Sequence, residues 1–132
     1  MATVDSLTTI TLTAGADLSG DQYKLVQLSA ANTVTLASAV TQAVIGVLVN
    51  APASGEAAEV AIEGVVKVIA GGSVGATDFV TTNSSGLAAS ATQADADGTD
   101  GFAKCIGICL EGTSTANEYI RVLLGRQSVQ TA

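Results

Sequence analysis

Short runs of β-branched and aliphatic residues alternate with turn residues along almost the whole chain. The clearest run covers residues 59–69, where Val60 and Ile62 alternate with Glu59 and Glu63, as in a strand with one buried face. Clusters of Gly, Ser and Asn separate the runs. The pattern predicts an all-β fold: a small single-domain β-sandwich or barrel built from short antiparallel strands and two long hairpins. The predicted strands span residues 7–13, 23–28, 33–37, 44–49, 59–69, 78–82, 87–91, 102–110 and 118–124.

The two long hairpins resemble each other. Each begins with an Ile-Gly pair, at residues 45–46 and 106–107, and each ends its second strand in a glycine, Gly64 and Gly125. Both pairs of matching glycines are offset by 61 residues. A duplication would account for this match, and so would a coincidence; the sequence leaves both open. Because Gly64 interrupts a strand pattern, it also predicts a bulge or a close backbone approach.

The composition predicts a thin hydrophobic core. The 132 residues suffice for one domain, and 48% of them are hydrophobic, but 23 are alanine, only 3% are aromatic and none is Trp. Small side chains remove little area from water, at roughly 25 cal/mol per Å². We therefore expect association with other subunits to add to the stability of the chain.

Composition also narrows the classes of function. The absence of His removes the usual general base and the commonest nucleophilic pairs, and no nucleophile has a base beside it in the sequence, so we expect no enzyme and no cofactor. Twelve acids against five bases give a net charge of −7, which argues against nucleic acid and against an anionic membrane surface. The longest apolar run, residues 43–49, is too short to cross a bilayer, and the first residues lack the features of a signal peptide.

The two cysteines are expected to be free thiols that pack as small buried hydrophobic residues. Cys105 and Cys109 lie four residues apart in the predicted strand 102–110. That spacing corresponds to about 13 Å along a strand, which is too far for a disulfide. A metal site would need further soft ligands that the sequence does not offer, so no metal is expected.

An acidic loop at residues 95–101 has some features of a calcium loop. Asp95, Asp97 and Asp100 surround Gly98, but the order of the EF-hand is broken and no acid occupies its twelfth position. We interpret the loop as a solvated turn, and the sequence leaves cation binding open.

Glycine-and-apolar strand signatures occur at residues 16–28, 45–60, 62–68, 106–112 and 119–125. Together these segments resemble the head decoration, or capsid cement, proteins of tailed bacteriophages. The resemblance extends over most of the chain, in glycine-and-apolar strand signatures rather than in catalytic residues. Where that family runs directly from an Ala-rich strand into the second Ile-Gly strand, this chain inserts the acidic loop.

The resemblance implies a structural virion protein that binds the outer surface of a phage capsid and stabilises it. It implies a homotrimer that contacts the major capsid protein and is made in the cytoplasm of the bacterial host. One alternative is another oligomeric β-structural virion component, such as a tail or fibre-tip domain. A second is a carbohydrate-binding or carbohydrate-processing domain, for which the available aromatic residues are Tyr23, Phe79, Phe102 and Tyr119.

The chain divides into an N-terminal strand or arm at residues 1–13, a β domain at residues 14–125 and a polar tail at residues 126–132. Apolar side chains in the first segment make it a candidate contact with the capsid or with another subunit, because a terminal strand can add to a neighbouring sheet edge. The alternative is that this segment is the first strand of the domain's own sheet. The candidate contact residues are Val4, Leu7, Ile10 and Leu12.

Overall fold

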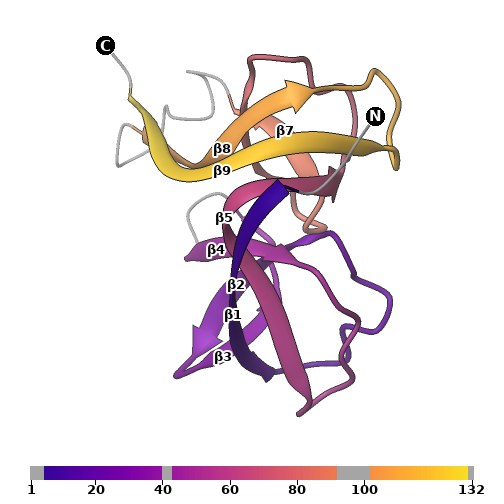
Figure 1. Cartoon of the computed structure of the whole chain (residues 1–132), viewed down its shortest axis with the longest axis vertical. Coiled ribbons are helices and arrows are strands. Elements are labelled where there is room, and N and C mark those ends of the chain that lie inside the picture. Colours follow the sequence, from indigo (N-terminus) through magenta and orange to yellow (C-terminus); the bar gives the residue numbers. More distant parts are fainter. Residues whose placement is uncertain (1–4, 40–42, 92–101, 131–132) are drawn as a thin grey trace.

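The computed structural model describes residues 5–39, 43–91 and 102–130. Within these ranges the chain forms nine strands and no helix, so the predicted all-β fold is confirmed (Figure 1). Each predicted run contributes one strand. The strands are β1 (Asp5–Ala14), β2 (Leu25–Ala30), β3 (Thr33–Leu36), β4 (Val44–Leu48), β5 (Ala57–Ile69), β6 (Phe79–Thr82), β7 (Ala88–Ala91), β8 (Phe102–Glu111) and β9 (Tyr119–Gln130).

Five strands close into a barrel, which lies in the lower half of Figure 1. Their order is β1-β3-β2-β4-β5, and β5 pairs back onto β1. β1 and β3 run parallel, whereas the other neighbouring strands of the barrel are antiparallel. Closure satisfies the backbone hydrogen bonds that a sheet edge would leave open.

A second sheet extends from the same β5 strand, in the order β5-β9-β8-β6-β7, with all neighbours antiparallel. The 13 residues of β5 are long enough to serve both sheets. Residues 57–61, 63 and 65 pair with β1, and residues 64–69 pair with β9. Gly64 adopts a φ of 106°, and the β1–β5 register shifts beside it, which confirms the irregularity predicted at this glycine.

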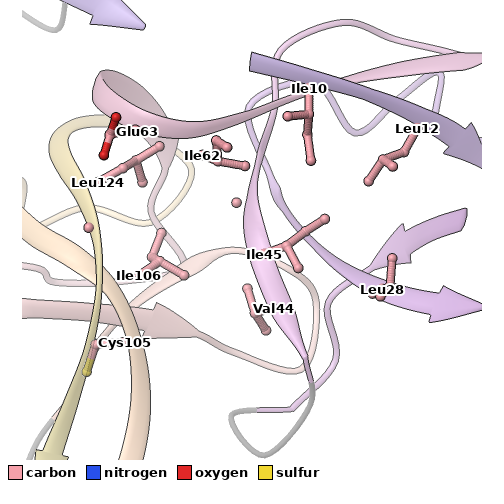
Figure 2. Close-up of a pocket in the computed structure, with 12 residues that line it drawn as sticks. Ile10, Leu12, Leu28, Val44, Ile45, Ile62, Glu63, Cys105, Ile106 and Leu124 are labelled. Atoms are coloured by element: carbon pink, nitrogen blue, oxygen red, sulfur yellow. The ribbon is translucent and has the colours of Figure 1, made fainter. Parts of the chain in front are cut away.

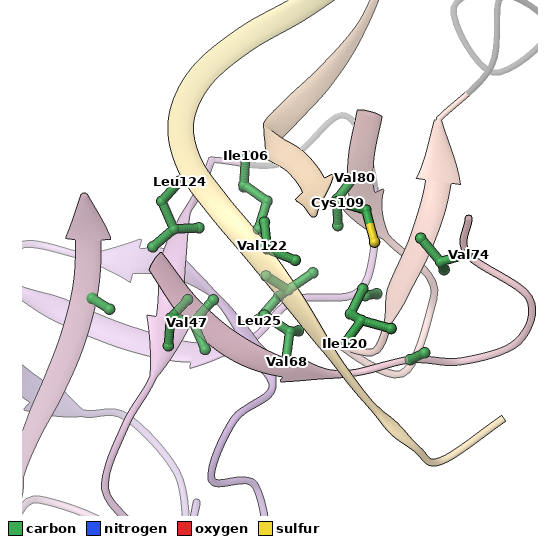
Figure 3. Packing of buried hydrophobic residues seen from close by; sticks show 14 of the residues in the cluster. Leu25, Val47, Val68, Val74, Val80, Ile106, Cys109, Ile120, Val122 and Leu124 are labelled. Atoms are coloured by element: carbon green, nitrogen blue, oxygen red, sulfur yellow. The ribbon is translucent and has the colours of Figure 1, made fainter. Parts of the chain in front are cut away.

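The molecule has two hydrophobic clusters because several strands bury both faces. The first lies inside the barrel. The second lies between the barrel and the second sheet, where Leu25 and Val47 of the barrel meet Val68, Ile120 and Val122 (Figure 3). The buried members of the first cluster are Ala14, Leu18, Val26, Val34, Leu48, Ala58 and Val60.

The larger side chains of the core are all aliphatic. The bulkiest fully buried residues are leucine, isoleucine and valine, and the core formed by the described residues contains no aromatic side chain. Phe79 and Tyr119 are instead 37% and 48% exposed. The core is therefore built from small units, as the composition predicted.

The N-terminal segment is integrated into the barrel. In β1, Ile10 pairs with Val60 and Leu12 with Ala58 of β5. Of the two interpretations given above, the structure thus shows the strand of the chain's own sheet for residues 5–14. Residues 126–130, the first part of the predicted polar tail, belong to β9. These residues continue β9, because their backbone pairs with the start of β8.

The two predicted hairpins are present as β4–β5 and β8–β9. Their glycines occupy matching positions: a Cβ on Gly46 would overlap the carbonyl oxygen of Ala61, and a Cβ on Gly107 would overlap that of Leu123. In each hairpin the backbone of the second strand approaches the glycine of the first. The acidic loop at residues 95–101 lies outside the described residues.

Candidate interaction surfaces

An apolar groove opens at one end of the barrel, and we call it the barrel-mouth groove (Figure 2). The alternation of side chains along each strand determines which residues line the groove. Ile10 and Leu12 lie opposite Val60 and Ala58, which are buried inside the barrel, so both side chains share the inner face. Ile62 follows Val60 two residues along β5 and continues that inner face to the open end.

The groove has a volume of about 480 Å³ and is lined mainly by apolar side chains. Glu63 is the one charged side chain among the twelve residues that line it. Ile10, Leu28 and Ile62 are 37%, 43% and 36% exposed, so the groove is accessible to solvent. Such a surface suits apolar side chains of a partner, because little polar surface must be desolvated. The lining residues are Ile10, Leu12, Leu28, Val44, Ile45, Gly46, Ile62, Glu63, Cys105, Ile106, Leu124 and Gly125.

The candidate contact residues of the N-terminal segment fall into three environments. Ile10 and Leu12 line the groove, and Leu12 also packs against the cluster inside the barrel. Leu7 packs against the larger cluster between barrel and second sheet, so it has an intramolecular partner. Val4 lies outside the described residues. Contact of any of them with a capsid stays a prediction.

Sequence reasoning missed the partners that complete the groove. Leu28, Ile45 and Ile62 come from β2, β4 and β5, and the structure brings them beside Ile10. The alternation of Val60 and Ile62 was the available signal for one inward face. No local pattern shows that this face closes against a strand some fifty positions earlier.

A second surface covers the outer face of the second sheet, and we call it the outer sheet face. Phe79 pairs with Ile108, Ile108 pairs with Leu123, and Leu123 pairs with Val65. Residues directly opposite one another share a face, so these four side chains form one apolar row across four strands. Leu123 is 45% exposed. The row therefore presents large apolar side chains to solvent.

Two tyrosines and a lysine stand beside this row. The ring centroids of Tyr23 and Tyr119 lie 5.8 Å apart in an edge-to-face arrangement. The Lys67 ammonium lies 4.6 Å from the centroid of Tyr23 and 4.9 Å from that of Tyr119. Cation–π attraction stabilises such a group, and it places the lysine over ring faces that a sugar would stack on. Tyr23 and Tyr119 therefore offer a poor surface for stacking against a carbohydrate.

Both cysteine thiols lie in the interior of the molecule. Cys105 and Cys109 lie buried in β8 and form no disulfide within the described residues, and burial raises the pKa of the Cys109 thiol. Within the described ranges, no three His, Cys, Asp or Glu side chains are placed to hold a metal ion. In the same ranges, no helical segment has the length and apolar character needed to cross a bilayer.

The fold is a closed five-stranded barrel joined through one shared strand to a second antiparallel sheet. No protein-family model and no curated protein sequence matches the chain. Among solved structures, the chain is similar to the N base of the head fiber gp8.5 of bacteriophage phi29, with a TM-score of 0.65 and 18% sequence identity. The match covers 94% of this chain and 98% of the other, so the two share a fold over nearly their whole lengths.

Proposed function

We propose that this chain is a structural virion protein that binds the outer surface of a bacteriophage capsid and stabilises it. The observation that carries this proposal is the fold shared with the base of a phage head fiber over 94% of the chain. The resemblance of several sequence segments to capsid cement proteins supports the same class independently. A fold by itself does not fix a function, so the proposal needs a direct test.

The electrostatics of the chain agree with a position outside the head. The net charge of −7 and the presence of only five bases disfavour contact with packaged DNA. We propose that the major capsid protein is the partner, that the chain acts as a homotrimer and that it carries no enzymatic activity. The thin aliphatic core supports oligomer formation, because association removes further apolar surface from water.

The alternative is another oligomeric β-structural component of the virion, such as a tail or fibre-tip domain. The similarity to a fiber base favours this alternative as well. Copy number separates a cement protein from a tail tip: a cement protein is present in hundreds of copies per particle, whereas a tail tip is present in a few. Quantitative protein measurement on purified particles gives the answer.

The functional test compares phage heads with and without this protein. Particles stripped of the protein are heated, and the temperature at which they release DNA is recorded before and after adding the full chain. A protein that binds only the assembled lattice stabilises it by mass action, so added protein is expected to raise the release temperature. An unchanged release temperature would contradict the cement function.

Deletion of residues 1–12 is a poor test of the N-terminal segment, because β1 closes the barrel and the truncated chain would lose that closure. A point substitution in the groove, Ile10→Asp, tests the segment with the strand retained. Ala31→Asp, at an exposed position between β2 and β3, is the matched control for the added charge. If Ile10 contacts the capsid, only the first variant fails to restore head stability.

A further inference from the structure

Five of the exposed large hydrophobic side chains of the described residues lie on two separate surfaces. Ile10, Leu28 and Ile62 line the barrel-mouth groove, which is concave. Phe79 and Leu123 stand on the outer sheet face, which is a sheet surface with side chains projecting from it. Exposed apolar patches of this kind mark interaction sites.

The two surfaces point in different directions within one molecule. Leu124 lines the groove, and Leu123, the preceding residue of β9, belongs to the outer sheet face. Successive side chains of a strand project to opposite sides. A single copy therefore cannot place its own outer sheet face in its own groove, whereas a neighbouring copy can.

The two surfaces differ in charge. Glu63 is the charged residue of the groove. On the outer sheet face, Lys67 lies directly across from Arg121 in the β5–β9 ladder, and Glu111 lies across from Arg121 in the β8–β9 ladder, so two bases stand beside one acid in this row. The rings of Tyr23 and Tyr119 hold the lysine ammonium in place. Copies of a chain with a net charge of −7 repel one another unless their contact places bases against acids. The groove and this face provide such a contact.

We propose that copies of this chain associate head to tail, with the outer sheet face of one copy seated on the barrel-mouth groove of the next. Leu123 and Phe79 of one copy pack against Leu28 and Ile62 of the other, and Lys67 lies near Glu63. A contact between two different surfaces closes into a ring when the rotation between copies allows it. The inference rests on the proposed function only for the number of copies, three, in that ring.

Two single variants each remove one side of the contact. Leu28→Asp places a charge in the groove, and Leu123→Asp places one on the outer sheet face; both side chains are more than 40% exposed, so the fold should tolerate the changes. Sedimentation velocity is expected to show an oligomer for the wild-type chain and monomers for both variants. Ala31→Asp adds the same charge at an exposed turn and should leave the oligomer intact.

An equal mixture of the two variants is the decisive sample. The Leu28→Asp chain keeps its outer sheet face, and the Leu123→Asp chain keeps its groove, so the mixture can form one intact contact and should sediment as a dimer. A contact between two identical surfaces would not be restored by mixing. A mixture that stays monomeric overturns the proposal, and so does a monomeric wild-type chain at high micromolar concentration.

Charge reversal supplies a second measurement that does not depend on buried apolar groups. Glu63→Lys and Lys67→Glu are each expected to weaken association about tenfold, a difference of about 1.4 kcal/mol. The variant that carries both substitutions should recover most of the lost affinity. Its two charges are exchanged between the positions and therefore still attract each other. If the wild-type chain, the two single variants and the double variant associate equally strongly, the proposed pairing of Lys67 with Glu63 is overturned. Since these measurements use the protein without phage heads, their failure leaves the capsid-binding test unaffected.

Discussion

The barrel and the second sheet use similar hairpins but bury them differently. In the first hairpin, β4 lies between the barrel interior and the second sheet, and four of its five residues are buried. In the second hairpin, β9 alternates between Val122 and Leu124, which are buried, and Leu123, which is 45% exposed. A strand covered on both faces completes the fold, whereas a strand covered on one face leaves a surface for a partner. The second hairpin therefore carries part of the outer sheet face, whereas the first hairpin exposes Ile62 of β5 only at the barrel-mouth groove.

The largest expected effect comes from filling the two matching glycines. Gly46→Ala and Gly107→Ala would each drive a methyl group into a backbone carbonyl of the neighbouring strand. We expect each to lower the free energy of unfolding by more than about 4 kcal/mol, the range of exceptional single substitutions. Denaturant unfolding followed by circular dichroism measures the loss.

Gly125→Ala is the control, because a Cβ at Gly125 meets nothing within 4 Å. Hydrogen exchange measured on the Gly46→Ala and Gly107→Ala variants then compares the stability of the barrel with that of the second sheet. Because β5 belongs to both sheets, we expect the barrel and the second sheet to unfold together. Retained protection in the barrel of the Gly107→Ala variant would show instead that the two regions unfold separately.

A smaller effect is expected from shortening one core residue in each region. Leu48→Ala empties space inside the barrel, and Ile120→Ala empties space between the barrel and the second sheet; both side chains are fully buried. Each should cost about 3 kcal/mol, with the larger loss for Leu48, because a closed barrel wall collapses less around a cavity. Thermal unfolding of both variants provides the comparison, and a larger loss for Ile120 would contradict this reasoning.

The aromatic–lysine group of the second sheet is expected to contribute modestly. Lys67→Met keeps the aliphatic stem and removes the cation from between the two tyrosine rings, at a cost of about 1 kcal/mol. Lys24→Met is the matched control, since its ammonium pairs with Asp21 at 3.0 Å near the surface, a contact worth about 0.5 kcal/mol. Equal losses in the two variants would mean that the rings add nothing beyond ordinary charge pairing.

The smallest effect concerns the pH dependence of the second sheet. Burial raises the pKa of the Cys109 thiol above its unfolded value of 9.0, so the protonated thiol is favoured in the folded state. Its contribution to stability is fully present below that unfolded pKa and is lost as the pH rises through the folded pKa. The wild-type chain should therefore lose stability more steeply above about pH 9 than the Cys109→Ala variant. Denaturant midpoints at several alkaline pH values test this, and parallel curves would contradict it.

The sequence by itself determined the local elements and the character of the core. Alternation with a period of two is set by neighbouring residues, so the runs around Val60, Ile62 and Val68 predicted strands that the structure contains. Gly64 signalled the irregularity in β5, because a φ of 106° favours glycine. The many alanines and few aromatic residues predicted a core of small aliphatic side chains, since composition limits the available side-chain volume.

Only the tertiary structure decided how those strands pair and which surfaces remain open. The pairing of Ile10 with Val60 closes the barrel, and the contact of Tyr23 with Tyr119 joins residues from opposite ends of the chain. Residues 126–130 lack the apolar alternation of a strand, yet they extend β9 because the backbone of β8 is available to pair with them. Such pairings depend on the free energy of assembling the whole sheet, which no short segment encodes. The barrel-mouth groove arises from this assembly and is therefore a property of the folded chain alone.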